Sequence, residues 1–527
     1  MSSAPPAPPA PHAPGDAPAP PVAPRRRRRR RLLIALTAVF AVVIVIVGSA
    51  AIWVASNAVR RTPPAAGSLE FRSPLPIPEL APSRLENGVR VFDLTAQQGR
   101  TSFRPRTETS TAGYNGAYLG PTLVAARGER VRVDVTNDLA DPTTVHWHGM
   151  HLPAASDGGP HTVIPPGGTW HPEWAVDQPA ATLWYHPHLH GRTREQVDAG
   201  LAGMFLVRDD EEAGLPLPRS YGVDDIPVIV QDRAFEPDGS FAGSIGMQFD
   251  GVLGDTILVN GAETPYLDVT TELVRLRLLN GSSARMYDFA FADGRSFDLI
   301  GTDGGLLESP VETSTLPLSP GQRAEIVVAL SAGERIALRS NAPDPALHAG
   351  SAAFDVLELR AAASLDASPA LPARLAALPE ASETDAAAQR TFVMSGHEIN
   401  DREMDLGRAD FSAAVDSSEV WTVRNDNPLP HSFHVHDTQF RVLSVDGAPP
   451  PPRLTGFKDT IALEWNREYR LLVRFEDYAD PTTPYMYHCH LLWHEDQGMM
   501  GQFLVVEPGQ QPDLTRPEGD SDDHVDH

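Results

Sequence analysis

VRVDVTN at residues 131–137, VRLRLLN at 274–280 and EVWTVRN at 419–425 are three similar segments of this chain. In each segment, two apolar residues at alternating positions precede an asparagine. Side chains two positions apart lie on the same face of a strand, so each segment is typical of a β-strand with one buried face. The asparagines, Asn137, Asn280 and Asn425, are 143 and 145 residues apart. This near-equal spacing indicates an internal triplication.

The sequence around these segments predicts an all-β protein. Period-two strands separated by Gly, Pro, Asn and Asp fill residues 80–506, and long amphipathic helical stretches are almost absent. Strands are expected at 131–135, 274–278, 323–328, 440–445 and 469–475. We expect three β-sandwich or barrel domains, at 68–210, 220–362 and 389–508. A linker rich in Ala, Ser and Pro is expected at 363–388, with one short helix near 373–378, and a disordered acidic tail at 509–527.

The N-terminal part is typical of a membrane anchor. Residues 1–24 hold ten prolines and seven alanines, and together with the arginine run at 25–31 they are expected to form a disordered cytoplasmic tail. Residues 32–54 carry no charge, and such a helix just spans a hydrocarbon core of about 30 Å. The basic run marks the cytoplasmic side of a single-pass anchor and places the remaining chain outside the cytoplasm. The alternative is a cleaved export signal and a secreted protein.

Charge and cysteine content exclude several classes of function. The net charge is −26, and the chain beyond residue 61 has 34 basic and 68 acidic residues. Such a surface repels nucleic acid and attracts metal ions and organic cations, although solubility alone also explains it. The single cysteine excludes an intramolecular disulfide and any C-x-x-C zinc or redox motif.

Histidines gather in four short windows, at 146–148, 186–188, 431–436 and 488–494. These windows hold ten of the 19 histidines in only 19 positions. Within VHWHG, HPHLHG, HVH and HCH the histidines are two residues apart, so on a strand each pair presents two imidazoles to one side. Eight imidazoles exceed the needs of one metal ion. Because the pairs come from both ends of the chain, we expect a site between the first and third domains, with copper, zinc and iron all possible.

Cys489 lies between His488 and His490, so on a strand its sulfur points away from the face that these imidazoles share. A second metal site is therefore expected behind the first one. Its other ligands are available as His431, His494 and Met499. Two histidines, a thiolate and a weak axial thioether are the ligands of blue-copper electron-transfer sites, and this donor set favours copper.

The four windows, VHWHG, WYHPHLHG, HSFHVH and HCHLLWHEDQGMM, together resemble the signature of the multicopper oxidases. The similarity extends over residues 80–506 and is closest to the three-domain bacterial laccase-like and copper-efflux oxidase branch. It implies three cupredoxin-like Greek-key domains and four copper ions. A type 1 copper would take His431, Cys489, His494 and axial Met499, with Met500 as the alternative axial ligand. A type 2 copper would take His146 and His434, and two type 3 coppers would take His148, His186 and His490, and His188, His436 and His488.

The same resemblance implies roles for two carboxylates. Asp157, eleven residues after His146, and Glu495, directly after His494, match acidic residues that deliver protons to dioxygen; the alternative is a solvated turn residue in each case. Asp459 is a weaker candidate for orienting a ligand histidine. Electrons are expected to enter at a solvent-facing edge of His494 or His431 and to pass through Cys489. Trp493 is expected beside the type 1 site.

The remaining histidines receive the ordinary interpretation. We expect His151, His161, His171 and His190 to lie next to the ligands or at the surface. His524 and His527 could capture copper weakly, although a solvated acidic tail is the simpler explanation.

The sequence therefore predicts a laccase-like oxidase that couples one-electron oxidation of phenolic or aromatic substrates to four-electron reduction of dioxygen to water. The alternative is a cuprous or ferrous ion oxidase that serves copper tolerance, which the acidic exterior would suit. Relatives specialised for cuprous ion tend to carry a methionine-rich insertion, and only Met394 and Met404 lie nearby here. A remote alternative is a non-catalytic copper-binding scaffold, similar to related division-associated proteins that have lost copper ligands. A two-domain copper nitrite reductase is disfavoured because it lacks eight paired imidazoles.

Overall fold

The structure, a computed structural model, describes residues 66–242, 251–342 and 352–514. They belong to the second of two units of the chain, which comprises residues 63–527. The predicted tail at 1–31 and anchor at 32–54 lie outside the described residues, as do His524 and His527. Within the described ranges, every helix is too short or too polar to span a bilayer.

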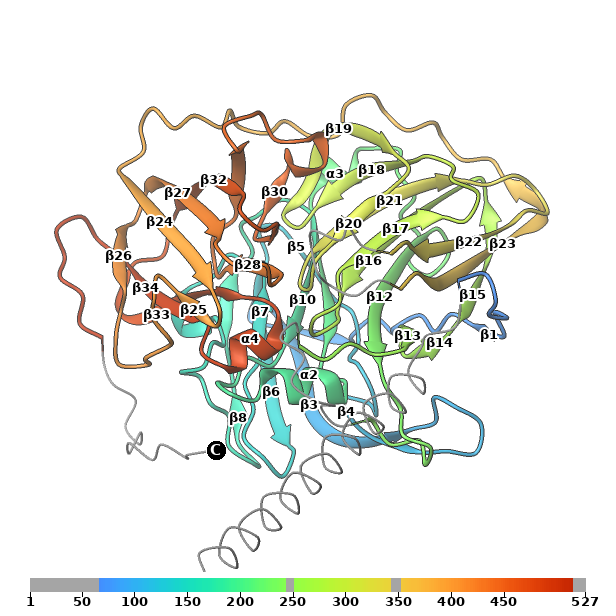
Figure 1. The fold of residues 1–527 in the computed structure, drawn as a ribbon, viewed down its shortest axis with the longest axis horizontal. Helices are drawn as coiled ribbons and strands as arrows, with labels where there is room; N and C mark the ends of the chain where they lie inside the picture. The colour runs from blue at the N-terminus through green and yellow to red at the C-terminus, as the bar shows by residue number, and fades with distance from the viewer. Residues whose placement is uncertain (1–65, 243–250, 343–351, 515–527) are drawn as a thin grey trace, which may run out of the picture. The chain divides into compact units, whose positions relative to one another are not determined.

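The described residues form three pairs of β-sheets, which confirms the all-β prediction (Figure 1). We refer to the pairs as the first, second and third sandwich. The first pairs β2(Ser83–Glu86), β3(Val89–Thr101), β6(Arg130–Asp138) and β8(Thr169–Trp170), flanked by β4(Thr109–Tyr114) and β9(Glu173–Ala175), with β5(Leu123–Ala126), β11(Gly203–Arg208), β10(Ala181–His186) and β7(His146–His148). Short helices α2(Thr193–Ala199) and α3(Asp210–Ala213) and the 3₁₀ turn η1(Ala154–Ser156) join these strands.

The second and third sandwiches have larger sheets. The second contains β14(Ala262–Glu263), β13(Thr256–Val259), β12(Asp225–Arg233), β16(Leu273–Asn280), β21(Arg323–Ala329), β18(Phe297–Thr302) and β19(Gly305–Thr313) in one sheet, and β1(Ser73–Pro74), β15(Pro265–Thr271), β23(Phe354–Asp366), β22(Arg335–Ser340), β17(Tyr287–Phe291) and β20(Leu316–Leu318) in the other. The third contains β25(Glu398–Ile399), β24(Ala388–Ser395), β27(Ser417–Asn425), β32(Glu468–Phe475), β29(Phe440–Val445) and β30(Phe457–Lys458), packed on β26(Phe411–Ala414), β34(Met500–Val506), β33(Asp480–Cys489), β28(His431–Val435) and β31(Thr460–Leu463). It also holds η3(Pro452–Leu454) and α4(Leu492–Asp496).

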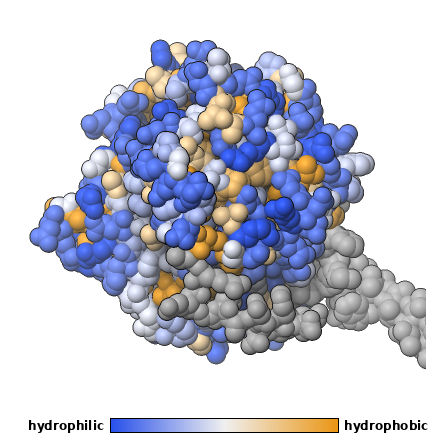
Figure 2. Space-filling model, turned by 90° about the vertical axis from the view of Figure 1, so that its left-hand side faces the viewer, coloured by the Kyte–Doolittle hydropathy of each residue, from blue (hydrophilic) through white to orange (hydrophobic). Residues whose placement is uncertain are grey.

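Each sandwich buries the apolar face of both its sheets in a core of its own. Val133 and Leu183 represent the two sheets of the first core, and Leu276 and Phe289 those of the second. In the third core, Trp421 and Phe433 represent the two sheets. Burying such a side chain contributes about 1.5–3 kcal/mol, so these cores are the main favourable term in folding. The face in Figure 2 is accordingly largely hydrophilic, with only scattered apolar residues.

The three asparagines of the repeated segment make the same hydrogen bonds. In each, the side-chain amide donates to two backbone carbonyls and the side-chain oxygen accepts from the backbone N–H two residues later. Asn137 donates to Asp141 and Ile164, Asn280 to Arg285 and Leu318, and Asn425 to Leu429 and Leu463, at 2.7–3.2 Å. The accepted bonds, from Leu139, Ser282 and Asn427, measure 2.9–3.1 Å. The repeat is therefore a structural unit, in which one buried asparagine closes the turn after each strand.

The strands predicted from the sequence lie within β6, β16, β21, β29 and β32. The short helix expected at 373–378 is wrong, because residues 367–387 contain only bends and one turn. Pro372 and Pro379 leave too few residues between them for a stable helix. Leu375 instead packs into the second core, and its N–H donates to the Glu308 carbonyl at 2.8 Å. Residues 73–74, at the start of the expected first domain, pair with β15 of the second sandwich.

The strands that carry the histidine windows meet where the first and third sandwiches touch. β7 pairs with β10 in the first sandwich, and β28 pairs with β33 in the third. Figure 1 shows β28 and α4 of the third sandwich beside β7, β10 and α2 of the first. The site is consequently built on these strands and on the residues that directly follow them, and strands hold side chains more firmly than loops.

Candidate metal centre

Two imidazoles and one thiol form a cluster in the third sandwich. His431 begins β28, Cys489 ends β33 and His494 lies in α4. The Cys489 sulfur is 3.6 Å from Nδ1 of His431 and 3.6 Å from Nδ1 of His494, and the two nitrogens are 3.2 Å apart. All three side chains are fully buried. Metal–nitrogen and metal–sulfur bonds of about 2.0–2.3 Å fit within this triangle.

The backbone brings Met499 to the same cluster. The Cys489 N–H donates to the Met499 carbonyl, and the Met499 N–H donates to the His494 carbonyl, both at 3.0 Å. Met499 is fully buried in the core that contains Cys489. Met500, the alternative axial ligand, begins β34 and pairs with His488. A thioether held at Met499 suits the weak fourth position of a thiolate site.

Burial also affects the protonation of the Cys489 thiol. Burial raises the pKa of the Cys489 thiol to about 12. The sulfur therefore keeps its proton near neutral pH unless a cation stabilises the thiolate.

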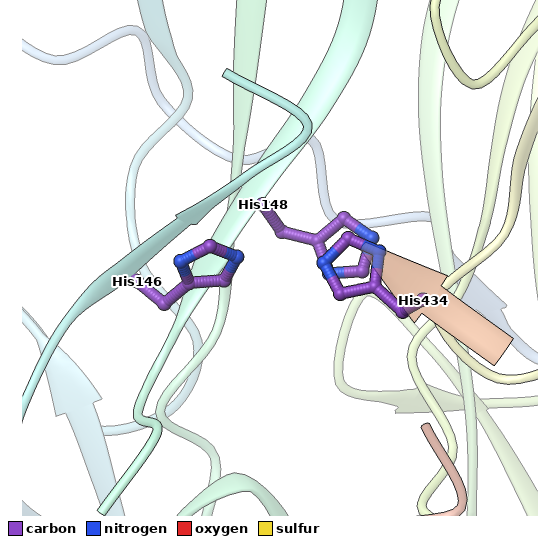
Figure 3. Close-up of side chains that lie close together, drawn as sticks. All are labelled: His146, His148 and His434. Atoms are coloured by element: carbon purple, nitrogen blue, oxygen red, sulfur yellow. The ribbon is translucent and has the colours of Figure 1, made fainter. Parts of the chain in front are cut away.

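Eight imidazoles form a second cluster between the first and third sandwiches. In three groups the ligand nitrogens lie within 4.8 Å of one another: His146, His148 and His434; His148, His186 and His490; His188, His436 and His488. Figure 3 shows His146 from the first sandwich facing His148 and His434, whose rings stack with centroids 3.7 Å apart. Nε2 of His488 lies 3.1 Å from Nε2 of His188 and 3.2 Å from Nε2 of His436.

The chemistry of these imidazoles fits metal ions. Buried nitrogens without a hydrogen-bond partner include Nε2 of His146, Nε2 of His434 and both ring nitrogens of His490. Unpaired buried polar atoms are costly, so their presence here points to a ligand. Burial, reinforced by neighbouring histidines, lowers the pKa of seven of the eight: His148, His186, His188, His434, His436, His488 and His490. Their lone pairs are thus available at neutral pH.

Alternation along β33 separates the two clusters, as the sequence suggested. His488 lies against His188 and His436, whereas the neighbouring Cys489 sulfur lies against His431 and His494. His490 contacts the rings of His148 and His186. Two peptide units therefore connect the sulfur to two imidazoles of the larger cluster.

Asp157 lies beside the histidine cluster and is almost fully buried. Its Oδ2 is 2.8 Å from Nδ1 of His436, and its backbone carbonyl is 3.0 Å from Nδ1 of His146. Engaging the outward nitrogens leaves the opposite nitrogens of both rings for a ligand.

Glu495 is also buried against the cluster. Its carboxylate oxygens lie 3.3 Å from Nδ1 of His488 and 3.7 Å from Nδ1 of His188, without a hydrogen bond in either case. Burial raises the pKa of Glu495 well above its ordinary value, with the nearby Asp496 carboxylate adding to the effect. These surroundings favour the protonated acid.

Asp459 touches two of the histidines. Its Oδ1 lies 3.0 Å from Nε2 of His148, and its backbone carbonyl accepts from Nδ1 of His434 at 2.9 Å. Because its Nε2 is engaged, His148 presents Nδ1 to the cluster, 3.4 Å from Nε2 of His186.

The other histidines lie outside these clusters. Nδ1 of His151 is 2.8 Å from Asp437 and its Nε2 is 3.2 Å from Asp477, which joins the first and third sandwiches. Although burial lowers the pKa of His151, the two carboxylates raise it to about 9. His161 contacts Gln502, His171 contacts Asp134, and His190 is exposed. The Arg194 guanidinium, which belongs to the first sandwich, lies over the ring of Trp493, 6.0 Å from the ring centroid.

One expectation about the thiol cluster is wrong. Neither His431 nor His494 has a solvent-facing edge, because both are 0% exposed. Nε2 of His431 contacts Asn427 at 3.2 Å, and the ring of His397 covers His494 with centroids 5.1 Å apart. Nε2 of His397 is buried without a hydrogen-bond partner. As a lone histidine in SGHEIN, His397 belongs to no spacing pattern, so its place beside His494 could not be predicted from the sequence.

Comparisons with known proteins agree with this geometry. Three family models described as multicopper oxidase match residues 95–212, 238–346 and 371–509. The multicopper oxidase mco of Staphylococcus epidermidis is 36% identical over 83% of this chain and 94% of its own length. Cell division protein FtsP of Xenorhabdus nematophila is 37% identical over 82% and 92%, respectively.

Solved structures show the same cupredoxin-like fold. A multi-copper oxidase from Pediococcus acidilactici superposes with a TM-score of 0.79 at 34% identity, covering 86% of this chain and 95% of that one. A bacterial laccase-like multi-copper oxidase CueO from Ochrobactrum sp., with oxidase activity towards lignin model compounds, gives 0.76 at 36%, covering 82% and 100%.

The thiol cluster makes a direct prediction for Cys489→Ser. We expect the variant to lose one copper per chain and the blue colour, because a hydroxyl is a poor soft ligand, while copper in the histidine cluster remains. Copper analysis and visible absorption measure this. A variant that stays blue would contradict the assignment of the sulfur.

Proposed function

The chain belongs to the multicopper oxidase family, and we propose that it is an active enzyme that couples one-electron oxidation of phenolic or aromatic substrates to four-electron reduction of dioxygen to water. The observation that carries this proposal is the pair of buried clusters joined through Cys489. Bound at the twelve ligand positions, four copper ions would supply the electron storage and the dioxygen chemistry.

Each residue has a separate task in this proposal. Asp157 holds the rings of His146 and His436 in a fixed orientation, at 3.0 and 2.8 Å. Glu495 holds a proton at its carboxyl group, within 3.3 Å of the His488 ring, for transfer to reduced oxygen. Cys489, through its own backbone, provides the shortest covalent connection between the clusters.

Replacing the carboxylates tests these tasks. We expect Glu495→Gln and Asp157→Asn to slow dioxygen reduction by roughly 10²-fold while the blue colour survives. An amide at position 495 cannot deliver a proton, and an amide at position 157 holds the His436 ring less firmly than a carboxylate does. Oxygen-electrode turnover and visible spectra measure this. Glu419→Gln, a buried carboxylate on β27 that pairs with Arg390 instead, is the control. Unchanged turnover in both variants would remove the proposed roles.

His397 is the proposed entry point for electrons. The ligand imidazoles are fully buried, whereas His397 is half-buried and its ring packs against His494. A reductant at the surface thus reaches His397 before it reaches His494.

We expect His397→Ala to change the rate of substrate oxidation several-fold without changing the reoxidation of fully reduced protein by dioxygen. Stopped-flow measurement of the two half-reactions separates these effects. The exposed His171→Ala variant serves as control. Equal rates for His397→Ala and wild type in both half-reactions would exclude His397 as the entry point.

The reductant is a phenol or aromatic compound in this proposal, and a metal ion is the second candidate. The resemblance to the laccase-like Ochrobactrum protein supports the first. The acidic exterior favours a metal ion as the reductant. Of Met394 and Met404, however, Met394 is buried in the core of the third sandwich, and Met404 alone is half-buried near the surface. Oxygen uptake by the copper-loaded chain with a phenol, with cuprous ion and with ferrous ion distinguishes the candidates. Strong preference for either metal would reverse our order.

A non-catalytic role is the remaining alternative, since the relatives include proteins named cell division protein FtsP. The complete set of ligand positions in this chain supports an enzyme instead. The same oxygen-uptake experiment tests this, because a copper-loaded chain without uptake with all three reductants would favour the scaffold.

We also propose that residues 32–54 anchor the enzyme with its catalytic domains outside the cytoplasm. Their 23 uncharged residues follow an unbroken arginine run. Membrane fractionation and N-terminal sequencing of the mature protein test this. A soluble protein beginning after residue 54 would indicate a cleaved export signal.

A further inference from the structure

Arg323 and Asp459 form a buried ion pair between the second and third sandwiches. Arg323 begins β21, and its Nη1 and Nη2 lie 2.7 and 2.6 Å from the two carboxylate oxygens of Asp459. Both side chains are fully buried. A bidentate ion pair of this kind fixes the carboxylate in the plane of the guanidinium.

All five N–H groups of the Arg323 guanidinium are used. Besides Asp459, Nε donates to the Thr182 carbonyl at 2.9 Å, Nη1 to the Gly321 carbonyl at 3.1 Å and Nη2 to the Asp303 carbonyl at 3.0 Å. Thr182 belongs to the first sandwich, so this one side chain contacts all three sandwiches. A lysine at this position could not satisfy the same acceptors.

The ion pair is held from both sides. The Asp303 side chain accepts from the Arg323 backbone N–H at 2.7 Å and pairs with Lys458, the only lysine of the chain, at 2.8 Å. Thr460 donates to Oδ1 of Asp459, also at 2.8 Å. Asp459 therefore has little freedom to rotate.

Gly149, the residue after His148, leaves space for the ion pair. A Cβ atom at Gly149 would lie 2.4 Å from Nη2 of Arg323 and 2.6 Å from Oδ2 of Asp459. Its φ of +86° also disfavours any other residue. The glycine that ends VHWHG thus allows both the close approach of the ion pair and the positive φ of the turn.

We propose that Arg323 is a positioning residue for the histidine cluster, which fixes His148 with Nδ1 toward the metal by holding Asp459 against its Nε2. This inference rests on the proposed function. Among the described residues, five groups of side chains could hold a metal, and no residue of the second sandwich belongs to any of them. Through Arg323, that sandwich nevertheless takes part in building the centre.

Copper-loaded full-length Arg323→Gln and Arg323→Lys variants test the proposal. We expect both to lose copper from the histidine cluster, with retention roughly 10–100-fold weaker, because a displaced Asp459 no longer orients His148. The type 2 paramagnetic resonance should change as well, since the Asp459 carbonyl holds Nδ1 of His434, a type 2 ligand position. The blue type 1 spectrum should remain unchanged, since the thiol cluster does not touch Arg323. Copper content and the two spectra are independent of turnover.

Arg285→Gln is the matched control. Arg285 is a buried arginine of the second sandwich that pairs with Asp232 at 2.8 Å and contacts no histidine of the cluster. We expect it to lower thermal stability as Arg323→Gln does and to leave every copper signal intact. If Arg323→Gln fails to fold, copper content and the two spectra are measured on Arg323→Lys, which retains the buried charge.

The outcomes separate this proposal from the proposed function. Wild-type-like copper content and type 2 resonance in both Arg323 variants would overturn the positioning role alone. Equal loss of copper in Arg285→Gln would also overturn it, since the effect would then reflect general destabilisation. A wild-type chain that binds no copper would overturn the proposed function and this inference together.

Discussion

The centre depends on one constraint, the alternation of side chains at His488, Cys489 and His490. Because neighbouring residues of a strand face opposite sides, the sulfur lies in the third sandwich while His488 lies at the interface with the first. Neither cluster could move relative to the other without breaking β33. The separation between the thiol cluster and the histidine cluster is thus set by backbone geometry rather than by flexible loops.

The three-sandwich architecture serves this constraint in different ways. The first and third sandwiches supply ligands, and their contact excludes water from eight imidazoles. The second sandwich supplies Arg323, which contacts all three sandwiches. A triplicated fold in which only two copies carry ligands therefore still needs the third copy to orient them.

Much of this arrangement could be predicted from local patterns. The asparagine repeat indicated three similar units because each asparagine closes the same turn, and the paired histidines indicated shared strand faces because strand periodicity is local. The short helix near 373–378 failed because packing of Leu375 into the second core and flanking prolines outweighed helix propensity. His397 and Arg323 could not be found, since their roles come from contacts between residues about 100 or more positions apart. Exposure of His431 and His494 likewise depends on tertiary packing.

In the proposed function, one chain stores enough electrons to reduce dioxygen to water. Anaerobic reductive titration of the copper-loaded protein, followed by visible and paramagnetic resonance spectra, measures this directly. We predict uptake of four electrons per chain, with the blue colour bleaching as the buried sulfur site is reduced. Uptake of a single electron, or of none, would contradict it.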